Sequence, residues 1–211
     1  MQPSKPILQG EALCFSYSPQ PAPPLFDQLW LALLPGVTWV CGDEGSGKTT
    51  LLQLLAGGLP MTGELHIEGV RLAPDRPDYQ RQVAWFDPHD TALNTLCARQ
   101  IFAELPARYP RCNSDALQAH IDGLSLAPHL DKALFMLSTG TRRKVLLAAV
   151  LAAQAPVTLL DQPFMALDRP SIDYLLQVLA EAARQPGRAW AVADYAAPPG
   201  VPLAGVIELG A

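Results

Sequence analysis

Residues 42–49 place glycine, lysine and threonine at the spacing that a phosphate-binding loop requires. They are Gly42, Asp43, Glu44, Gly45, Ser46, Gly47, Lys48 and Thr49, and they match the pattern G-x-x-x-x-G-K-[ST] in full. The glycines reach backbone angles that are closed to other residues, so successive N–H groups can turn toward phosphate oxygens. Lys48 supplies a positive charge, and Thr49 supplies a hydroxyl for Mg²⁺. We therefore expect the chain to bind a nucleoside triphosphate together with Mg²⁺.

The residues on both sides of this loop predict the strand and the helix that hold it. Val37–Cys41 is an apolar stretch typical of a buried strand. Residues 50–56, beginning at Thr50, have the pattern of a helix that Gly57 and Gly58 end. The alternative, a glycine-rich turn that matches by chance, leaves the flanking strand and helix unexplained.

A second apolar strand predicts a partner for Thr49. Val157–Leu160 reads as a buried strand, and Asp161 follows it directly. A carboxylate at the end of such a strand holds the Mg²⁺ shell opposite the hydroxyl of the phosphate-binding loop. Lys48, Thr49 and Asp161 together predict the site of a nucleoside triphosphatase.

The composition of the chain excludes several other classes. Its 211 residues fit one domain, 1–211, and the formal net charge of -5 gives no basic stripe for nucleic acid. The longest uninterrupted apolar stretch, Val145–Ala153, is too short to span a membrane, and nothing resembles a secretory signal. The cysteines form no C-x-x-C pair, so a zinc site has little support. We expect a cytoplasmic protein that reaches a membrane only through a partner.

The remaining elements predict an α/β fold with a P-loop core, a mostly parallel sheet, an N-terminal antiparallel β layer and an inserted helical subdomain. The helical subdomain is expected at about 90–140, in a region broken at Pro106, Pro110 and Pro128. Strand and helix alternate after it, as a parallel sheet requires. The predicted strands are Leu8–Ser16, Leu29–Leu34, Gly63–Gly69, Gln82–Phe86 and, as the last one, Ala189–Ala193; the later helices are Thr141–Ala153 and Pro170–Arg184.

Three further segments resemble motifs of one family, the nucleotide-binding domains of ABC ATPases. Leu137–Arg143 resembles the family signature, usually LSGGQ followed by basic residues, although Thr139 and Thr141 replace a glycine and the glutamine. Residues 15–17, ending in Tyr17, resemble the stretch whose aromatic ring stacks on adenine. Residues 166–168, ending in Asp168, resemble the D-loop. The likeness runs from about Leu8 to Leu209.

The resemblance implies an ATP-dependent dimer in which each signature faces the phosphate-binding loop of the other copy. Ser138 and the N–H of Gly140 would then contact the γ-phosphate held by the opposite subunit, unless Ser138 only caps a core helix. The dimer could be formed by two copies or by two different chains. The resemblance also implies a membrane-embedded permease partner that docks near the helical subdomain. The docking groove is expected around Trp85, Phe86, Ile101, Phe102 and Phe135, although these residues could equally belong to the core.

Three positions depart from the family at places linked to hydrolysis. Gln162 stands where the family has the glutamate that activates water, and Asp194 stands where it has a histidine that contacts the γ-phosphate. The slot of the Q-loop glutamine falls at Pro88, between Asp87 and His89. A neutral amide accepts no proton, and loss of a general base costs about 10² to 10⁴ in rate. Lys48, Asp161, Gln162 and Asp194 are thus the expected catalytic residues, with slow hydrolysis.

Several alternatives stay open from the sequence. Asp87, His89 or Asp194 could take over the missing roles. The chain could be an ATP-gated regulatory or scaffolding module that hydrolyses little, or the degenerate half of a heterodimer. A nucleic-acid function fits the acidic charge poorly, and a kinase would have no use for the signature.

Overall fold

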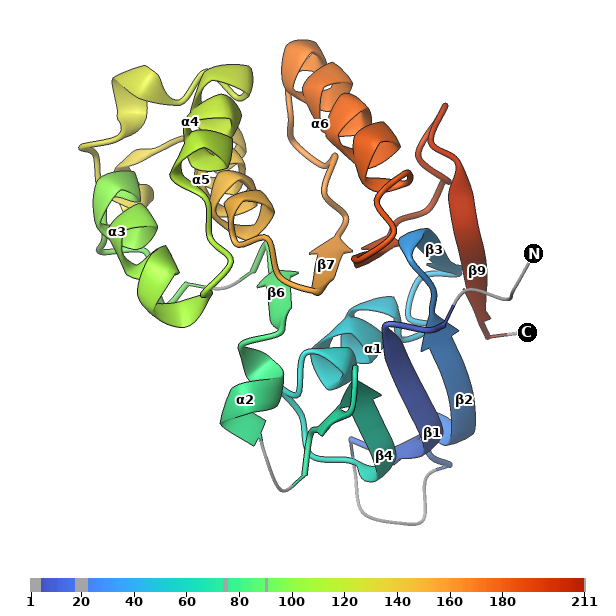
Figure 1. Cartoon of the computed structure of the whole chain (residues 1–211). Helices are drawn as coiled ribbons and strands as arrows, with labels where there is room; N and C mark the ends of the chain where they lie inside the picture. The colour runs from blue at the N-terminus through green and yellow to red at the C-terminus, as the bar shows by residue number, and fades with distance from the viewer. Residues whose placement is uncertain (1–4, 18–22, 74–75, 90, 211) are drawn as a thin grey trace.

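The computed structural model describes residues 5–17, 23–73, 76–89 and 91–210, and it contains two sheets. Figure 1 shows helix α1 and the smaller sheet on one side of the larger sheet, and helices α3 to α6 on the other side. The strands are β1 (Leu8–Phe15), β2 (Phe26–Leu33), β3 (Gly36–Gly42), β4 (Thr62–Ile67), β5 (Val70–Arg71), β6 (Val83–Phe86), β7 (Val157–Asp161), β8 (Ala189–Ala193) and β9 (Leu203–Leu209). The helices are α1 (Lys48–Leu55), α2 (Arg76–Gln80), α3 (Ala98–Arg108), α4 (Ser114–Gly123), α5 (Thr139–Ala152) and α6 (Arg169–Ala182), with short 3₁₀ helices at Ala127–His129 and Leu134–Met136.

The larger sheet is parallel and forms the core of the fold. Its strand order is β6-β7-β8-β3-β9, and every neighbouring pair runs in the same direction. The carboxyl ends of β3, β7 and β8 therefore meet at one edge, where parallel α/β sheets bind their ligands. This edge carries the phosphate-binding loop after β3, Asp161 at the end of β7 and Asp194 after β8. The predicted α/β fold is confirmed.

The smaller sheet confirms the predicted antiparallel layer. Its order is β2-β1-β4-β5, and all its pairs are antiparallel. Helix α1 packs into a core that includes residues of both sheets, and four of its leucines are fully buried: Leu51, Leu52, Leu54 and Leu55. This burial fixes the position of the helix whose N-terminus begins the phosphate-binding site.

Two details of the predicted secondary structure were wrong. Pro106 does not break the middle region, because it lies inside α3. It falls in the last turn, where a proline removes only one hydrogen bond, while Ile101, Phe102 and Leu105 stay buried on one face. The strand at Ala189–Ala193 is not the last, since β9 follows and pairs with β3 at the edge of the sheet. The sequence of β9, Leu-Ala-Gly-Val-Ile-Glu-Leu, is a mostly apolar stretch interrupted by Gly205 and Glu208, and most of its residues are at least partly exposed.

Helices α3 and α4 and both 3₁₀ helices fall within the range expected for the helical subdomain. Whether this range acts as a separate subdomain remains a prediction.

In the part of the chain that the structure describes, no helix combines the length and the apolar character needed to cross a membrane.

Candidate active site

The phosphate-binding loop joins the carboxyl end of β3 to the first residue of α1. Gly42 has φ +146°, and a Cβ at this position would lie 2.5 Å from the carbonyl oxygen of Leu209 and 2.6 Å from Oγ of Ser46. No larger residue fits there without moving the backbone of β9. Gly57, with φ +68°, ends α1 as predicted, and its N–H donates to the carbonyl of Leu54 at 2.9 Å. The conformation of the loop thus requires glycine at position 42, the first position of the sequence pattern.

Lys48 lies in the centre of the loop. Its Nζ donates to the carbonyl oxygens of Gly42 at 2.7 Å and of Asp43 at 2.8 Å, and the residue is only 6% exposed. The ammonium also lies 4.9 Å from the centre of the Tyr195 ring. A buried ammonium that bonds only neutral oxygens can exchange them for the stronger, charge-assisted bonds of a phosphate.

Thr49 and Asp161 meet as the sequence predicted. The Thr49 hydroxyl donates to Oδ2 of Asp161 at 2.7 Å, although the two residues belong to α1 and β7. Asp161 is buried, and its Oδ1 makes no hydrogen bond with any described group. Burial raises the pKa of this carboxyl, and the Thr49 hydrogen bond opposes that rise. A hydroxyl and a carboxylate are the hard oxygen ligands that Mg²⁺ prefers, and a hydrated cation would satisfy the buried oxygen.

Gln162 follows Asp161 in an unusual backbone conformation. Its φ is +43°, its N–H donates to the carbonyl of Ala193 at 2.8 Å, and its carbonyl accepts a hydrogen bond from Arg143. These two contacts hold the backbone of Gln162 against the end of β8, and neither of them uses its side chain. Its neighbour Asp161 contacts Thr49, so Gln162 stands beside the candidate metal site.

Arg143 is a residue of the site that sequence reasoning missed. Its guanidinium is buried, lies 5.3 Å from the centre of the Phe86 ring and leaves Nε without a partner among the described residues. Burial lowers its pKa, while the charges of Asp161 and Asp194 oppose that effect. Arg143 therefore links α5, the helix that begins at the signature, to the backbone of Gln162. The basic residues after the signature were the available signal.

Asp194 lies close to the same charges. Its Oδ1 accepts a hydrogen bond from the N–H of Tyr195 at 2.8 Å, and its carbonyl accepts one from the indole of Trp39 at 3.1 Å. Burial raises the pKa of the carboxyl, and the positive charges of Arg143 and Lys48 oppose the rise. The charge of Lys48 therefore acts on Asp194, and the expected place of Asp194 near the γ-phosphate stays a prediction.

The segment after β6 carries two charged groups, Asp87 and His89, that act on Asp161. Oδ1 of Asp87 accepts a hydrogen bond from the N–H of His89 at 2.8 Å, and the carbonyl of Pro88 accepts one from Arg142 at 3.1 Å. The charges of Asp87 and His89 both act on the pKa of Asp161, in opposite directions. Pro88 itself is buried and has no amide side chain to offer. In this segment, Asp87 and His89 are therefore the groups whose charges influence Asp161.

Ser138 and Gly140 form the first turn of α5. Ser138 is exposed, caps the helix by accepting the N–H of Thr141 at 3.2 Å, and lies 2.9 Å from the Thr141 hydroxyl. A Cβ on Gly140 would lie 2.6 Å from the carbonyl of Ala166, so the signature packs directly on the D-loop. Within the described ranges, neither residue makes a hydrogen bond with the phosphate-binding loop of its own chain.

Asp168 connects the D-loop to both neighbouring helices. Its Oδ1 caps α6 by accepting the N–H of Ser171 at 3.0 Å, and its Oδ2 accepts a hydrogen bond from Lys144 at 2.6 Å. These contacts, that with Lys144 first, lower the pKa of the Asp168 carboxyl to about 2. In one chain this aspartate therefore holds α5 and α6 together, and its expected contact with nucleotide stays a prediction.

Tyr17 lies beside the first turn of α1 and is 69% exposed. Its hydroxyl lies 2.6 Å from that of Thr50, and its ring meets Phe15 edge-on at 4.9 Å between centres. An exposed ring beside the phosphate-binding helix is compatible with stacking on a base. That role also stays a prediction.

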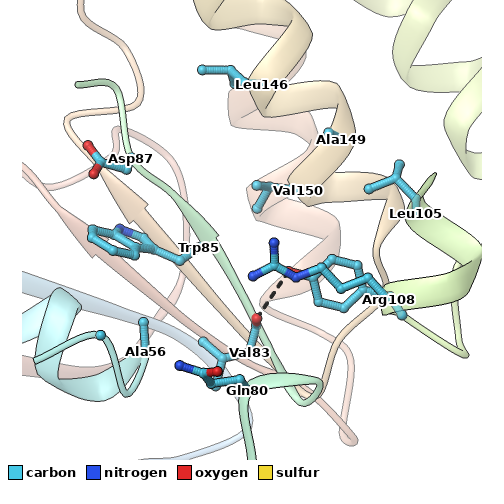
Figure 2. A pocket seen from close by; sticks show the side chains of 12 residues that line it. Ala56, Gln80, Val83, Trp85, Asp87, Leu105, Arg108, Leu146, Ala149 and Val150 are labelled. Carbon is cyan, nitrogen blue, oxygen red and sulfur yellow. Dashed lines mark hydrogen bonds between the residues drawn. The ribbon is translucent and has the colours of Figure 1, made fainter. Parts of the chain in front are cut away.

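A cavity of about 260 Å³ opens between β6, α3 and α5, next to the segment of Asp87 (Figure 2). Trp85 and Asp87 face it from β6 and the segment after it, and Leu146, Ala149 and Val150 face it from α5. Of the groove residues expected from sequence, Phe86, Ile101 and Phe102 are buried core and Phe135 is exposed. Only Trp85 lines this cavity.

Comparison with known proteins agrees with this geometry. The family model described as ABC transporter matches residues 30–165. A cytochrome c biogenesis ATP-binding export protein, CcmA, from Pseudomonas fluorescens is 32% identical over 158 residues, which cover 74% of this chain and 75% of the relative. The CcmA protein of Pseudomonas syringae pv. syringae is 31% identical and covers 89% of this chain and 87% of its own length.

Solved structures share the fold. The ATP-binding subunit of an ABC transporter superposes with a TM-score of 0.80 at 20% identity, covering 90% of this chain and 79% of the other. A dimeric ATP-binding cassette bound to ADP and Pi gives a TM-score of 0.76 at 20% identity, covering 90% and 88%. The sequence matches, the fold and the arrangement of Lys48, Thr49 and Asp161 point to one conclusion. The chain belongs to the ABC transporter family, as the ATP-binding subunit of an ABC system.

Proposed function

We propose that the chain binds Mg-ATP at residues 42–49 and hydrolyses it slowly to drive a membrane partner. The contact between Thr49 and Asp161, with one buried carboxylate oxygen left without a partner, carries this proposal. Lys48 holds the phosphates, while Thr49 and Asp161 hold Mg²⁺ through their oxygens. When bound, Mg²⁺ neutralises charge that develops on the phosphate oxygens. ATP affinity and phosphate release, measured on the wild-type protein with Mg²⁺, test this proposal.

Gln162 sets the rate of hydrolysis in this account. Gln162 directly follows Asp161, and its backbone is held by Ala193 and Arg143. We expect its side chain to meet the water that would attack the terminal phosphate. An amide orients water through hydrogen bonds but accepts no proton, so it supplies positioning without general-base catalysis. Asp194 adds a second carboxylate near the phosphates, where like charges repel.

We propose further that ATP joins two copies of the chain, or this chain and a related one. Ser138 is exposed at the N-terminus of α5. The apolar side chains of Phe135 and Met136, just before the signature, and of Met165, just before the D-loop, are exposed as well. Exposed apolar side chains beside neutral hydrogen-bond donors fit a surface that closes over a partner and its nucleotide.

The size of the protein in solution tests the dimer. We expect a monomer without nucleotide and a dimer with Mg²⁺ and a non-hydrolysable ATP analogue, measured by light scattering. Replacing Ser138 by Glu should keep the monomer in both conditions, since a carboxylate would face the partner's phosphates. A wild-type protein that stays monomeric with the analogue, in the presence of a related chain as well, contradicts the dimer.

The partner is proposed to be a permease in an export system, because the relatives are described as export proteins of cytochrome c biogenesis. The chain would then act in the cytoplasm, at the inner face of a membrane, with the permease docked near the cavity lined by Trp85 and Asp87. Nucleic acid is not an expected partner, given the net charge of -5.

Deletion of the gene tests the export role. We expect mature c-type cytochromes to fall by at least about tenfold, and a copy of the wild-type gene to restore them. A copy carrying Lys48→Ala should not restore them, because it cannot couple ATP to export. Normal cytochrome levels after deletion contradict this role and leave the ATPase proposal untouched.

A second candidate is an ATP-gated module that hydrolyses almost nothing, or the weaker half of a heterodimer. Gln162 and Asp194, both at positions linked to hydrolysis, favour it. The two candidates share ATP binding and differ in ATP turnover, which phosphate release by the wild-type protein with Mg²⁺ measures.

A further inference from the structure

Tyr195 places its ring next to the ammonium group of Lys48. The centre of its ring lies 4.9 Å from Nζ of Lys48, which is the distance of a cation–π contact. The side chain is nevertheless 59% exposed, and its hydroxyl makes no hydrogen bond with another residue in the described ranges. The ring therefore contacts the buried ammonium while more than half of the side chain is open to solvent.

The neighbouring Asp194 fixes this arrangement. Its Oδ1 accepts the N–H of Tyr195 at 2.8 Å, and the carbonyl of Asp194 is held by Trp39. The backbone that carries Tyr195 is therefore tied to both β8 and β3. Because Asp194 uses its carboxylate for this turn and carries a negative charge when ionised, it cannot serve as a neutral donor to phosphate.

We propose that the Tyr195 hydroxyl donates a hydrogen bond to the terminal phosphate of ATP, and so supplies the donor that Asp194 does not. This inference rests on the proposed function, because it requires nucleotide in the loop that holds Lys48. A phosphate oxygen bound to Nζ at about 2.8 Å lies within reach of a phenol whose ring already touches that ammonium. The ring also shields the ammonium from water, which strengthens its attraction to phosphate.

Tyr195→Phe tests the proposal, because it removes the hydroxyl and keeps the ring. We expect the affinity for a non-hydrolysable ATP analogue to fall by about tenfold, the effect of one hydrogen bond to a charged group, and the affinity for ADP to stay the same. Isothermal calorimetry with Mg²⁺ measures both. Tyr17→Phe is the matched control, and any change it causes should be equal for the two nucleotides, since Tyr17 is expected at the adenine that both share.

Three results overturn the inference. Equal analogue affinity in the wild type and Tyr195→Phe means that the hydroxyl contacts nothing. If Tyr195→Phe loses affinity equally for the ATP analogue and for ADP, the hydroxyl contacts a group that both nucleotides share and not the terminal phosphate. Tighter binding of both nucleotides by Tyr195→Ala shows that the ring blocks the site. Each is distinguishable from failure of the proposed function, in which the wild-type protein itself binds neither nucleotide.

Discussion

Lys48→Ala is expected to weaken ATP binding by roughly 30-fold to several thousandfold. Truncating one partner of a buried, hydrogen-bonded charge pair costs about 2 to 5 kcal/mol, and tenfold in affinity corresponds to about 1.4 kcal/mol. Lys48 is buried in the centre of the loop, where its Nζ contacts the carbonyls of Gly42 and Asp43. Equilibrium titration of wild type and variant with a fluorescent ATP analogue measures the loss.

Two controls make this result specific. Lys5→Ala removes an exposed lysine outside the site and should leave the affinity unchanged. Thermal unfolding of Lys48→Ala shows whether the loop carbonyls, once deprived of the ammonium, destabilise the fold. A folded Lys48→Ala protein that keeps wild-type affinity would falsify the assignment of the phosphate-binding loop.

Gln162→Glu is expected to raise ATP turnover by one to three orders of magnitude. The substitution keeps the length of the side chain and adds a group that accepts a proton, and general-base catalysis contributes about 10² to 10⁴. The backbone contacts of residue 162 with Ala193 and Arg143 do not involve its side chain, so they should persist. Phosphate release under saturating Mg-ATP measures the change.

Gln162→Ala completes this test. If Gln162 orients water, the alanine variant should turn over more slowly than the wild type while ATP affinity stays unchanged. Equal turnover in the wild type, Gln162→Glu and Gln162→Ala means that another group activates water. The nearest candidates by their electrostatic effects on the site are Asp87, His89 and Asp194.

Much of the fold was predictable because its buried strands are local and uniformly apolar. Val157–Asp161 is buried at every position, and the carboxylate at its end marks where the sheet meets its ligand. The phosphate-binding loop was equally clear, since its glycines and Lys48 are adjacent in sequence. Edge strand β9 was missed although it is mostly apolar, because Gly205 and Glu208 interrupt its run and its place is set by pairing with β3.

The remaining parts of the site depend on contacts between distant segments. Arg143 reaches the backbone of Gln162, and the ring of Tyr195 reaches Lys48, across separations that no local pattern encodes. Sequence spacing predicted the pairing of Thr49 with Asp161, but not the buried oxygen that Asp161 leaves without a partner. Asp168, expected near nucleotide, is tied within its own chain to Lys144 and Ser171, which its sequence position alone did not show.

The most direct test of the whole account is ATP affinity and phosphate release measured on one sample of the wild-type protein with Mg²⁺. We predict micromolar binding together with Mg²⁺-dependent turnover below about 10⁻² s⁻¹, against about 1 to 10³ s⁻¹ for ordinary enzymes. Tight binding without any release would support the gated module instead. Absence of ATP binding by the folded protein would contradict the central claim that residues 42–49 and Asp161 form an ATP site.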